Sequence, residues 1–319
     1  MKRVYLTGAS GFVGAGLLSR FCNELFTCTI AVRSPLQGLP TAVRVETIAS
    51  LTDEVDLHEG LAGQDVVIHC AGRAHVMHEQ ATDPLVEFRA VNLHGTLNLA
   101  RQAAAAGVKR FIFLSSIKVN GEATQPGQPY SAEDIPAPQD PYGISKLEAE
   151  QALHTLAAET GMEVVIIRPV LVYGPGVKAN FYRMMSWLAK GVPLPLGAIH
   201  NRRSLVALDN LVDLIVTCID HPAAANQVFL VSDDEDLSTS QLLSRMTQAL
   251  GKPKRLLPLP TWILTTIAAV LGKQEVAQRL CGSLQVDISK TKSLLGWTPP
   301  VSVNNALEKT AKYFLEHNQ

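Results

Sequence analysis

Two residues four positions apart could do acid–base chemistry in this chain: Tyr142 and Lys146, in the segment Tyr-Gly-Ile-Ser-Lys. On a helix this spacing places both side chains on one face, about one turn apart. A tyrosine phenol has an unperturbed pKa of about 10 and is a poor base near neutral pH. A neighbouring ammonium group favours the phenolate, so we expect Lys146 to lower the pKa of Tyr142.

A glycine-rich loop near the N-terminus offers a place for a dinucleotide. Gly8, Gly11 and Gly14 have a G-x-x-G-x-x-G spacing between a predicted strand and a predicted helix. Glycine lets backbone N–H groups approach a pyrophosphate, and the helix adds its positive N-terminal end. A simple turn would use the same residues, but the position directly after KRVYL favours dinucleotide binding. With the Tyr/Lys pair, the loop predicts redox chemistry on an alcohol or ketone.

The residue after the second predicted strand bears on the choice of dinucleotide. An acidic residue there would bind the ribose hydroxyls of NAD, but the chain has Arg33. Arg33 can pair with a 2′-phosphate, so NADP(H) is favoured over NAD. The alternative interpretation is a solvated surface arginine.

Hydroxyl and capping residues surround the Tyr/Lys pair. Ser115 and Ser116 follow the apolar run RFIFL, at the end of a strand where open α/β sheets bind ligands. A hydroxyl at this place can hydrogen-bond the reacting oxygen. Asp140 and Pro141 are suited to the cap and first turn of a helix, which places Tyr142 at a helix start.

The elements that must position these residues alternate between strands and helices. Amphipathic helices are expected over 83–106 and 142–160. This alternation predicts an α/β fold with a Rossmann-type, doubly wound parallel sheet over residues 1–170. Residues 171–319 are expected to form a smaller, partly helical substrate-binding region, with the chain crossing back into the first domain. The candidate strands are Arg3–Leu6, Thr29–Val32, Val66–His69, Phe111–Leu114 and Val164–Ile167.

Composition excludes several classes of protein. Apolar residues make up 47% of the chain and charged residues 18%, so a large core is expected and disorder is not. A net charge of −1 without a basic run argues against nucleic-acid binding. Five cysteines without a repeated spacing are typical of reduced thiols. The glycine loop leaves no room for a signal peptide before it, so a cytoplasmic location is expected.

The motifs together resemble the extended short-chain dehydrogenase/reductase superfamily. Within it the chain is similar to the branch of nucleotide-sugar epimerases, dehydratases and 4-ketosugar reductases. The resemblance extends over nearly the whole chain and keeps the family order. It is carried by TGASGFVG (7–14), HCAG (69–72), VNLHGT (91–96), SSIKVNG (115–121), YGISK (142–146), RPVLVYGPG (168–176), RRSLVALDNLVD (202–213) and LGWTP (295–299).

The resemblance implies roles for individual residues. Tyr142 would be the catalytic acid/base, Lys146 would bind the nicotinamide ribose, and Ser116, or its neighbour Ser115, would be the catalytic serine. Nucleotide sugars would be held through their diphosphate by Asn180, Arg203 and Arg279; the alternative for each arginine is a surface ion pair. Ser116 and Tyr142 would also contact the sugar. The residues that would bind NAD or NADP are Gly8, Ser10, Gly11, Phe12, Val13, Gly14, Arg33, Ala71, Tyr142, Lys146 and Pro169.

Departures from the family pattern narrow the reaction. Ile117 and Lys118 stand where 4,6-dehydratases have an Asp-Glu pair, which argues against dehydration, and Asn120 replaces a usual tyrosine. Arg33 argues against permanently bound NAD. We therefore favour a 4-ketosugar reductase of surface-polysaccharide precursor synthesis. The alternative is a 4-epimerase of a UDP-sugar (UDP-glucose or UDP-N-acetylglucosamine) with bound NAD. A catalytically idle dinucleotide-binding protein would be expected to lack the tyrosine or the lysine.

Other features leave alternatives open. His69 is expected to pack under the cofactor, and neither His69 nor His75 belongs to a cluster with metal-ligand spacing, so no metal is expected. The apolar segment 258–271 is expected to be a packed helix or a subunit contact. A membrane-surface helix is the less favoured alternative. The resemblance implies a homodimer through the helix at 83–106 and the tyrosine helix.

Overall fold

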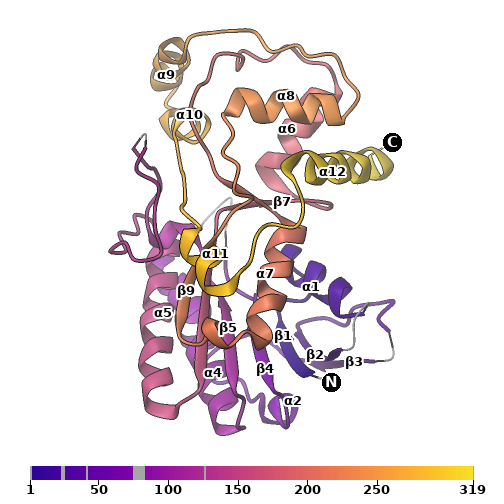
Figure 1. The fold of residues 1–319 in the computed structure, drawn as a ribbon, viewed down its shortest axis with the longest axis vertical. Coiled ribbons are helices and arrows are strands. Elements are labelled where there is room, and N and C mark those ends of the chain that lie inside the picture. Colours follow the sequence, from indigo (N-terminus) through magenta and orange to yellow (C-terminus); the bar gives the residue numbers. More distant parts are fainter. Residues whose placement is uncertain (1, 23–25, 41, 75–82, 126, 319) are drawn as a thin grey trace.

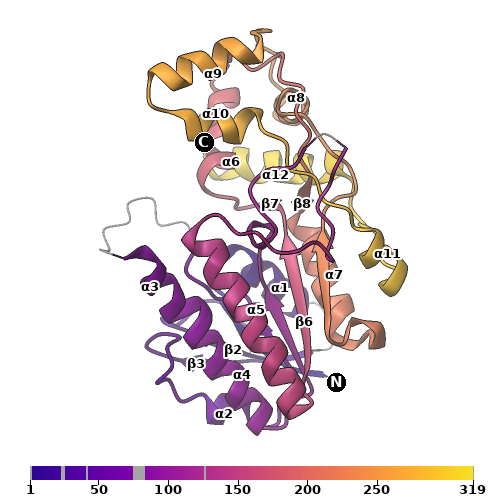
Figure 2. The same cartoon turned by 90° about the vertical axis from the view of Figure 1, so that its left-hand side faces the viewer.

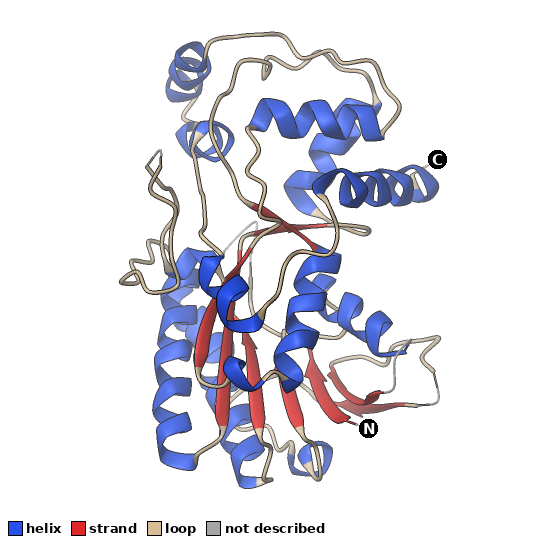
Figure 3. Cartoon of the chain, in the orientation of Figure 1, coloured by secondary structure: helices blue, strands red, loops and turns tan. Residues whose placement is uncertain are grey.

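The computed structural model describes residues 2–22, 26–40, 42–74, 83–125 and 127–318. Within these residues, seven parallel strands form one sheet in the order β3-β2-β1-β4-β5-β6-β9, and β7 and β8 form a separate parallel pair (Figures 1 and 3). The order reverses beside β1, so the predicted Rossmann-type doubly wound sheet is confirmed. The strands are β1 (Lys2–Thr7), β2 (Phe26–Val32), β3 (Val43–Thr47), β4 (Val66–His69), β5 (Arg110–Leu114), β6 (Glu163–Pro169), β7 (Leu171–Tyr173), β8 (Leu205–Ala207) and β9 (Gln227–Val231).

Helices cover both faces of the large sheet (Figure 2). α1 and α7 share one apolar core with the sheet, and α2, α4 and α5 share another. Short 3₁₀ turns connect other elements at η2 (Ile117–Val119) and η3 (Pro222–Ala224). The sheet-covering helices are α1 (Phe12–Cys22), α2 (His58–Leu61), α3 (Pro84–Arg89), α4 (Thr96–Ala105), α5 (Pro141–Thr160) and α7 (Leu208–Asp220).

A smaller, mostly helical region lies beyond the carboxyl ends of the strands (Figure 1). Side chains of α6, α8 and α12 form most of its apolar core. β9 and α7 follow residue 171 but belong to the large sheet and its cover; the division at residue 170 stays a prediction. The remaining helices are α6 (Ala179–Ala189), α8 (Thr239–Ala249), α9 (Thr261–Val270), α10 (Gln274–Cys281), α11 (Ser289–Leu295) and α12 (Val303–His317).

The sequence located the central strands better than the edge strands. β4 and β5 are continuous apolar runs whose residues are almost all buried, and both were expected within one residue of their bounds. β3 was missed because its sequence, VRVET, is short and has no buried residue. β9 was missed because it follows helices and turns rather than the regular alternation of the first 170 residues.

The helix expected over 83–106 is interrupted. α3 leads into a wider π-helical segment, η1 (Ala90–Gly95), before α4 begins. Such segments hold an extra residue in the turn and are frequent at functional sites. η1 carries the buried side chain of Asn92. Ala103 of α4 is fully buried in the core against the sheet, so helix-on-sheet packing accounts for this small residue, and the homodimer stays a prediction.

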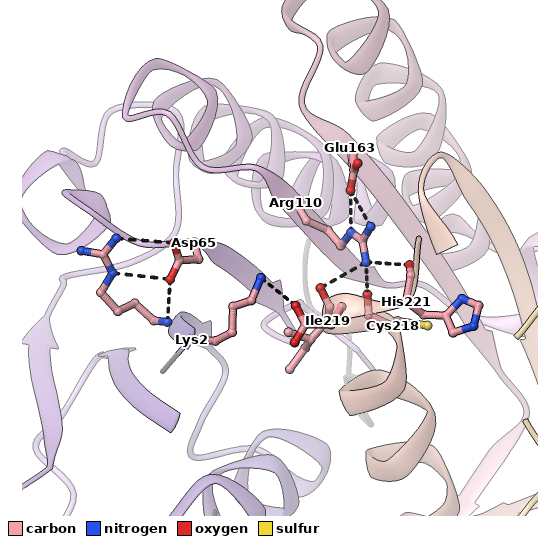
Figure 4. Close-up of polar contacts among 9 residues, drawn as sticks. Lys2, Asp65, Arg110, Glu163, Cys218, Ile219 and His221 are labelled. Atoms are coloured by element: carbon pink, nitrogen blue, oxygen red, sulfur yellow. Dashed lines mark hydrogen bonds and ion pairs between the residues drawn. The ribbon is translucent and has the colours of Figure 1, made fainter. Parts of the chain in front are cut away.

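An arginine fixes α7 to the end of the sheet that lies opposite the glycine loop (Figure 4). The guanidinium of Arg110 donates hydrogen bonds to the carbonyls of Cys218, Ile219 and His221 at 2.7, 3.1 and 3.0 Å. It also donates to Glu163 of β6 at 2.8 Å. The last carbonyls of a helix have no partners inside the helix and carry partial negative charge. Arg110 therefore satisfies the end of α7 and anchors it to β5 and β6.

The turn from β1 into α1 depends on two close backbone approaches. Gly8 has a φ of +75°, and a Cβ atom there would lie 2.6 Å from the backbone nitrogen of Ala71. A Cβ atom at Gly14 would lie 2.1 Å from the carbonyl oxygen of Gly8. The amide of Gly11 donates to the same carbonyl at 2.8 Å. These glycines therefore let the loop, the strand end after β4 and the start of α1 meet.

We expect Gly14→Ala to lower the free energy of unfolding by about 1–3 kcal/mol, because the added methyl group meets backbone. Gly16→Ala is the matched control in the same helix: its Cβ would lie 3.1 Å from the movable end of Leu208. This control is expected to stay within about 1 kcal/mol of the wild type, because alanine favours a helix interior. Urea denaturation measures both. Equal stability of the two variants would contradict the close approach.

Candidate active site

A backbone cradle lies at the carboxyl ends of β1 and β4. The loop Gly8–Gly11 leaves β1, and the chain after β4 passes beside it, where the Ala71 amide donates to the Thr7 hydroxyl at 3.3 Å. α1 starts directly after the loop, with its unpaired N–H groups at this edge. Side chains larger than hydrogen at Gly8 or Gly14 would fill or break the cradle. The residues present therefore fit the pyrophosphate of a dinucleotide.

The phenol of Tyr142 lies in the first turn of α5. Asp140 caps this helix by accepting a hydrogen bond from the Gly143 amide at 2.6 Å, and Pro141 occupies the first turn, as predicted. Tyr142 shares a side-chain hydrogen bond with Ser116. The Tyr142 residue is half-buried, and burial of its phenol raises the pKa of Tyr142 to about 12. The Ser116 hydrogen bond opposes this rise in pKa, and the Asp140 carboxylate adds to it.

Lys146 does not produce the lowered tyrosine pKa that the spacing predicts. Its ammonium donates to the carbonyl oxygen of Leu114 at 2.8 Å and lies 4.3 Å from the centre of the Phe113 ring. Burial lowers the pKa of Lys146 to about 8, so its amine stays mostly charged near neutral pH. The expected lowering of the Tyr142 pKa is not found: burial of the phenol raises this pKa, and Lys146 is not among the groups that shift it.

The two adjacent serines face different partners. Ser115 is buried, and its hydroxyl donates to the carboxylate of Glu150. Ser116 is half-buried and hydrogen-bonds Tyr142, and its side chain also accepts from the Lys118 amide at 3.3 Å. Of the two serines, Ser116 is the one placed beside the phenol, whereas Ser115 belongs to the support of α5.

The sequence patterns did not predict a buried ion pair that lies one turn after Lys146 on α5. Glu150 lies one turn after Lys146 on α5 and pairs with Arg168 of β6, Nη2 to Oε2 at 2.5 Å. Arg168 also donates to the side chain of Asn120 at 3.0 Å. All three side chains are buried, so removing Glu150 or Arg168 would leave the other as a buried charge without its ion-pair partner. The signals were the spacing of Glu150 from Lys146 and the arginine of the RPVLVYGPG segment.

A second missed residue, Asn92, ties three parts of the site together. Its amide donates to the hydroxyl of Ser145 and to the carbonyl of Arg73, both at 3.0 Å, and its carbonyl accepts from the Arg73 amide at 2.8 Å. The π-helical segment η1 places this side chain toward α5. A polar residue inside a helix that must cover a sheet was the available signal.

His69 is a structural residue. Its ring nitrogens pair with the hydroxyls of Thr7 at 2.6 Å and Thr96 at 2.9 Å, and burial lowers its pKa to about 3. The neutral ring of His69, at the end of β4, stacks on the ring of Phe113 in β5. His75 lies outside the described residues. Within the described residues there is no group of three His, Cys, Asp or Glu side chains that could hold a metal ion.

The remaining predicted cofactor residues lie along the carboxyl edge of the sheet. Pro169 is buried at the end of β6, and Ala71 is half-buried after β4. The loop residue Ser10 is exposed, and Phe12 and Val13 are half-buried at the start of α1. Arg33 is exposed directly after β2, on the strand next to β1.

The predicted substrate residues lie in the smaller region. Asn180 is exposed in the first turn of α6. The guanidinium of Arg203 donates to the carbonyls of Arg279 and Gly282 at 3.0 and 3.1 Å. Burial lowers the pKa of Arg203. The structure thus joins Arg203 to the backbone of the 279–282 segment, while the side chain of Arg279 is exposed at the end of α10.

We expect Lys146→Met to remove a pH dependence of stability. The pKa of Lys146 falls from its ordinary 10.5 to about 8, so between these values the unfolded chain binds more protons than the folded one. Wild-type stability should therefore rise with pH across this window, by about 3 kcal/mol from this residue. Denaturation from about pH 7 to about pH 11 should show the wild type gaining on the variant by this amount. Lys312→Met, at an exposed site, is the control. If the difference in stability between the wild type and Lys146→Met stayed as constant with pH as that between the wild type and Lys312→Met, the buried charge of Lys146 would be contradicted.

Comparison with known proteins adds sequence evidence to this geometry. Residues 4–232 match the model of the NAD dependent epimerase/dehydratase family. The chain is 50% identical to a UDP-glucose 4-epimerase of Vibrio cholerae, over 99% of this chain and 97% of the relative. It is 29% identical to an N-acetyl-alpha-D-glucosaminyl-diphospho-ditrans,octacis-undecaprenol 4-epimerase of Escherichia coli O157:H7, over 98% and 96% of the two chains.

A solved structure shares the fold. The crystal structure of UDP-glucuronic acid 4-epimerase from Bacillus cereus in complex with NAD superposes with a TM-score of 0.80 at 21% identity, covering 99% of this chain and 100% of the other. The superposition extends over both the sheet and the smaller helical region. The glycine cradle, the Tyr142–Ser116 pair and these similarities lead to one conclusion: the chain is an enzyme of the NAD dependent epimerase/dehydratase family.

Proposed function

We propose that this enzyme is a 4-epimerase of a UDP-sugar, with UDP-glucose as its first candidate substrate. The observation that carries the proposal is the Tyr142 phenol in the first turn of α5 with Ser116 as its hydrogen-bond partner, together with the glycine loop at the carboxyl end of β1. The 50% identity to a UDP-glucose 4-epimerase over nearly the whole of both chains favours epimerisation over reduction. The sequence motifs alone favoured a 4-ketosugar reductase over a 4-epimerase, and this similarity reverses that preference.

The chain's residues supply proton transfer and orientation in this reaction. NAD, when bound, would accept the hydride from C4 of the sugar and return it to the opposite face of the ketosugar. In the first half, Tyr142 Oη takes the proton of the C4 hydroxyl while Ser116 Oγ orients that oxygen. In the second half, Tyr142 gives the proton back to the C4 oxygen. Proton and hydride both return, so the sugar leaves with only its C4 configuration changed.

For Tyr142 to act as a base near neutral pH, the bound cofactor would have to lower its pKa. At about 12, the phenol is protonated near neutral pH and ready to act as an acid. To act as a base it needs added positive charge nearby, which the oxidised nicotinamide ring carries. Lys146 would bind the nicotinamide ribose and contribute its charge there. The pyrophosphate would lie on the backbone of Gly8, Gly11 and the first turn of α1.

The diphosphate of the substrate would be held by exposed groups of the smaller region. Asn180 and Arg279 are both exposed and suited to hydrogen-bond phosphate oxygens. The guanidinium of Arg203 already donates two hydrogen bonds to carbonyls of the 279–282 segment. Its first role would therefore be to hold that segment in place, with its remaining donors left for phosphate.

The second candidate is a 4-ketosugar reductase, and Arg33 is the observation that favours it. The residue at this position binds the adenosine ribose in dinucleotide folds, and an exposed arginine suits the 2′-phosphate of NADP(H). A reductase needs an exchangeable reduced cofactor, whereas an epimerase can retain NAD. Mass spectrometry of the cofactor released from purified protein separates the two: retained NAD supports the epimerase, and NADP or an empty site supports the reductase.

The activity test is the interconversion of UDP-glucose and UDP-galactose by the purified enzyme. We expect Tyr142→Phe to lower kcat by about 10²–10⁴-fold, because general acid–base catalysis is lost, while the cofactor still binds. Ser116→Ala should also lower kcat at unchanged stability, whereas Ser115→Ala should act mainly on stability through Glu150. Full activity of Tyr142→Phe, or no turnover of any UDP-hexose by the wild type, would refute the proposal.

A further inference from the structure

The helix α9 exposes an apolar surface that the rest of the chain does not cover. None of its ten residues is buried, although its sequence, TWILTTIAAV, has no charged side chain. Trp262 is 69% exposed, Ile267 50% and Val270 82%. A surface helix of a water-soluble domain normally turns its apolar stripe toward the core and polar residues toward water. Packing of α9 in this chain therefore does not account for its composition.

The exposed residues form one stripe. Trp262, Thr266 and Val270 are spaced by four, Ile267 lies beside them, and Ile263 on the same side is half-buried. On the other side, Leu264 packs on the core of the smaller region, and α10 lies against the helix. The stripe therefore points away from the protein, and α9 lies at the end of the molecule farthest from the sheet (Figure 2).

The charged residues that precede and follow α9 in the sequence are mostly basic. Lys252, Lys254 and Arg255 precede α9 and Lys273 follows it, and all four are exposed. No acidic residue occurs from 252 to 274, and Glu275 follows in α10. An apolar stripe that carries a tryptophan and has basic flanks complements the surface of a bilayer with anionic headgroups. A second copy of this chain would instead bring like charges together around the stripe.

We propose that α9 and its basic flanks dock on a bilayer surface that contains anionic phospholipid. The apolar stripe would enter the boundary between headgroups and acyl chains, and the lysines would face the phosphates. Ten residues are too few to cross the hydrocarbon core, which needs about 20, so the helix would lie in the plane of the surface. In keeping with this, the described residues contain no helix long and apolar enough to span a membrane. This inference goes beyond the proposed function and does not depend on it.

Flotation of the full-length enzyme with vesicles tests the docking. We expect binding to phosphatidylcholine vesicles that contain phosphatidylglycerol, and at least about tenfold weaker binding to phosphatidylcholine alone. Ile267→Asp should reduce binding to the anionic vesicles at least about tenfold, because it places a charge in the apolar stripe. Lys254→Glu with Lys273→Glu should do the same by reversing the flanking charge. Trp262 fluorescence should shift to shorter wavelength on binding, and Trp262→Phe should abolish the shift.

Leu294→Asp is the matched control for Ile267→Asp. Leu294 is 41% exposed, lies on the helix α11 and has lysines nearby in sequence, but it belongs to a different surface. This variant should bind vesicles like the wild type, and all variants should keep the wild-type rate on a soluble nucleotide sugar. No flotation of the wild type with either vesicle would overturn the proposal. A wild-type dimer that Ile267→Asp separates, without vesicle binding, would assign the stripe to a second copy instead.

Discussion

The geometry of the site depends on the position of one phenol oxygen. The phenol of Tyr142 hydrogen-bonds Ser116, and burial raises its pKa to about 12. Burial makes the neutral form of the phenol more stable, so the free enzyme presents an acid. The protein can change this only by bringing positive charge to the same place. Under the proposed function, binding of NAD would therefore lower the proton affinity of Tyr142.

Several buried contacts keep that oxygen in place, and all of them act on α5. Asp140 fixes the first turn of the helix, Asn92 holds Ser145 from the side, and Glu150 pairs with Arg168 of strand β6. The Asn92 and Arg168 contacts link α5 to η1 and β6, whereas the Asp140 contact fixes the start of α5 from within. A shift of the tyrosine helix would therefore break several buried polar contacts at once, which is costly in a low-dielectric interior. The wider turn at η1 brings Asn92 into this arrangement.

Local patterns in the sequence predict the parts of this arrangement that are local. The apolar runs of β4 and β5, the cap of α5 and the glycine loop each follow from a few neighbouring residues. The pKa of Tyr142 does not, because burial depends on strands and loops distant in the sequence, and a spacing of four residues reports only proximity. Arg203 shows the same limit. Its guanidinium donates to carbonyls of the 279–282 segment, and no residue close to Arg203 in the sequence predicts these hydrogen bonds. The edge strand β3 has no buried residue, so its sequence lacks the apolar run by which the other strands were predicted.

The proton affinity of Tyr142 in the cofactor-free enzyme is the most direct measure of the site. Carbon-13 NMR of protein labelled at tyrosine Cζ reports the ionisation of each phenol, and Tyr142→Phe identifies the signal of interest. We expect this signal to titrate at a pKa of about 12 and to move to lower pH when NAD is added. A Tyr142 pKa at or below the ordinary value of about 10 in the cofactor-free enzyme would contradict the account.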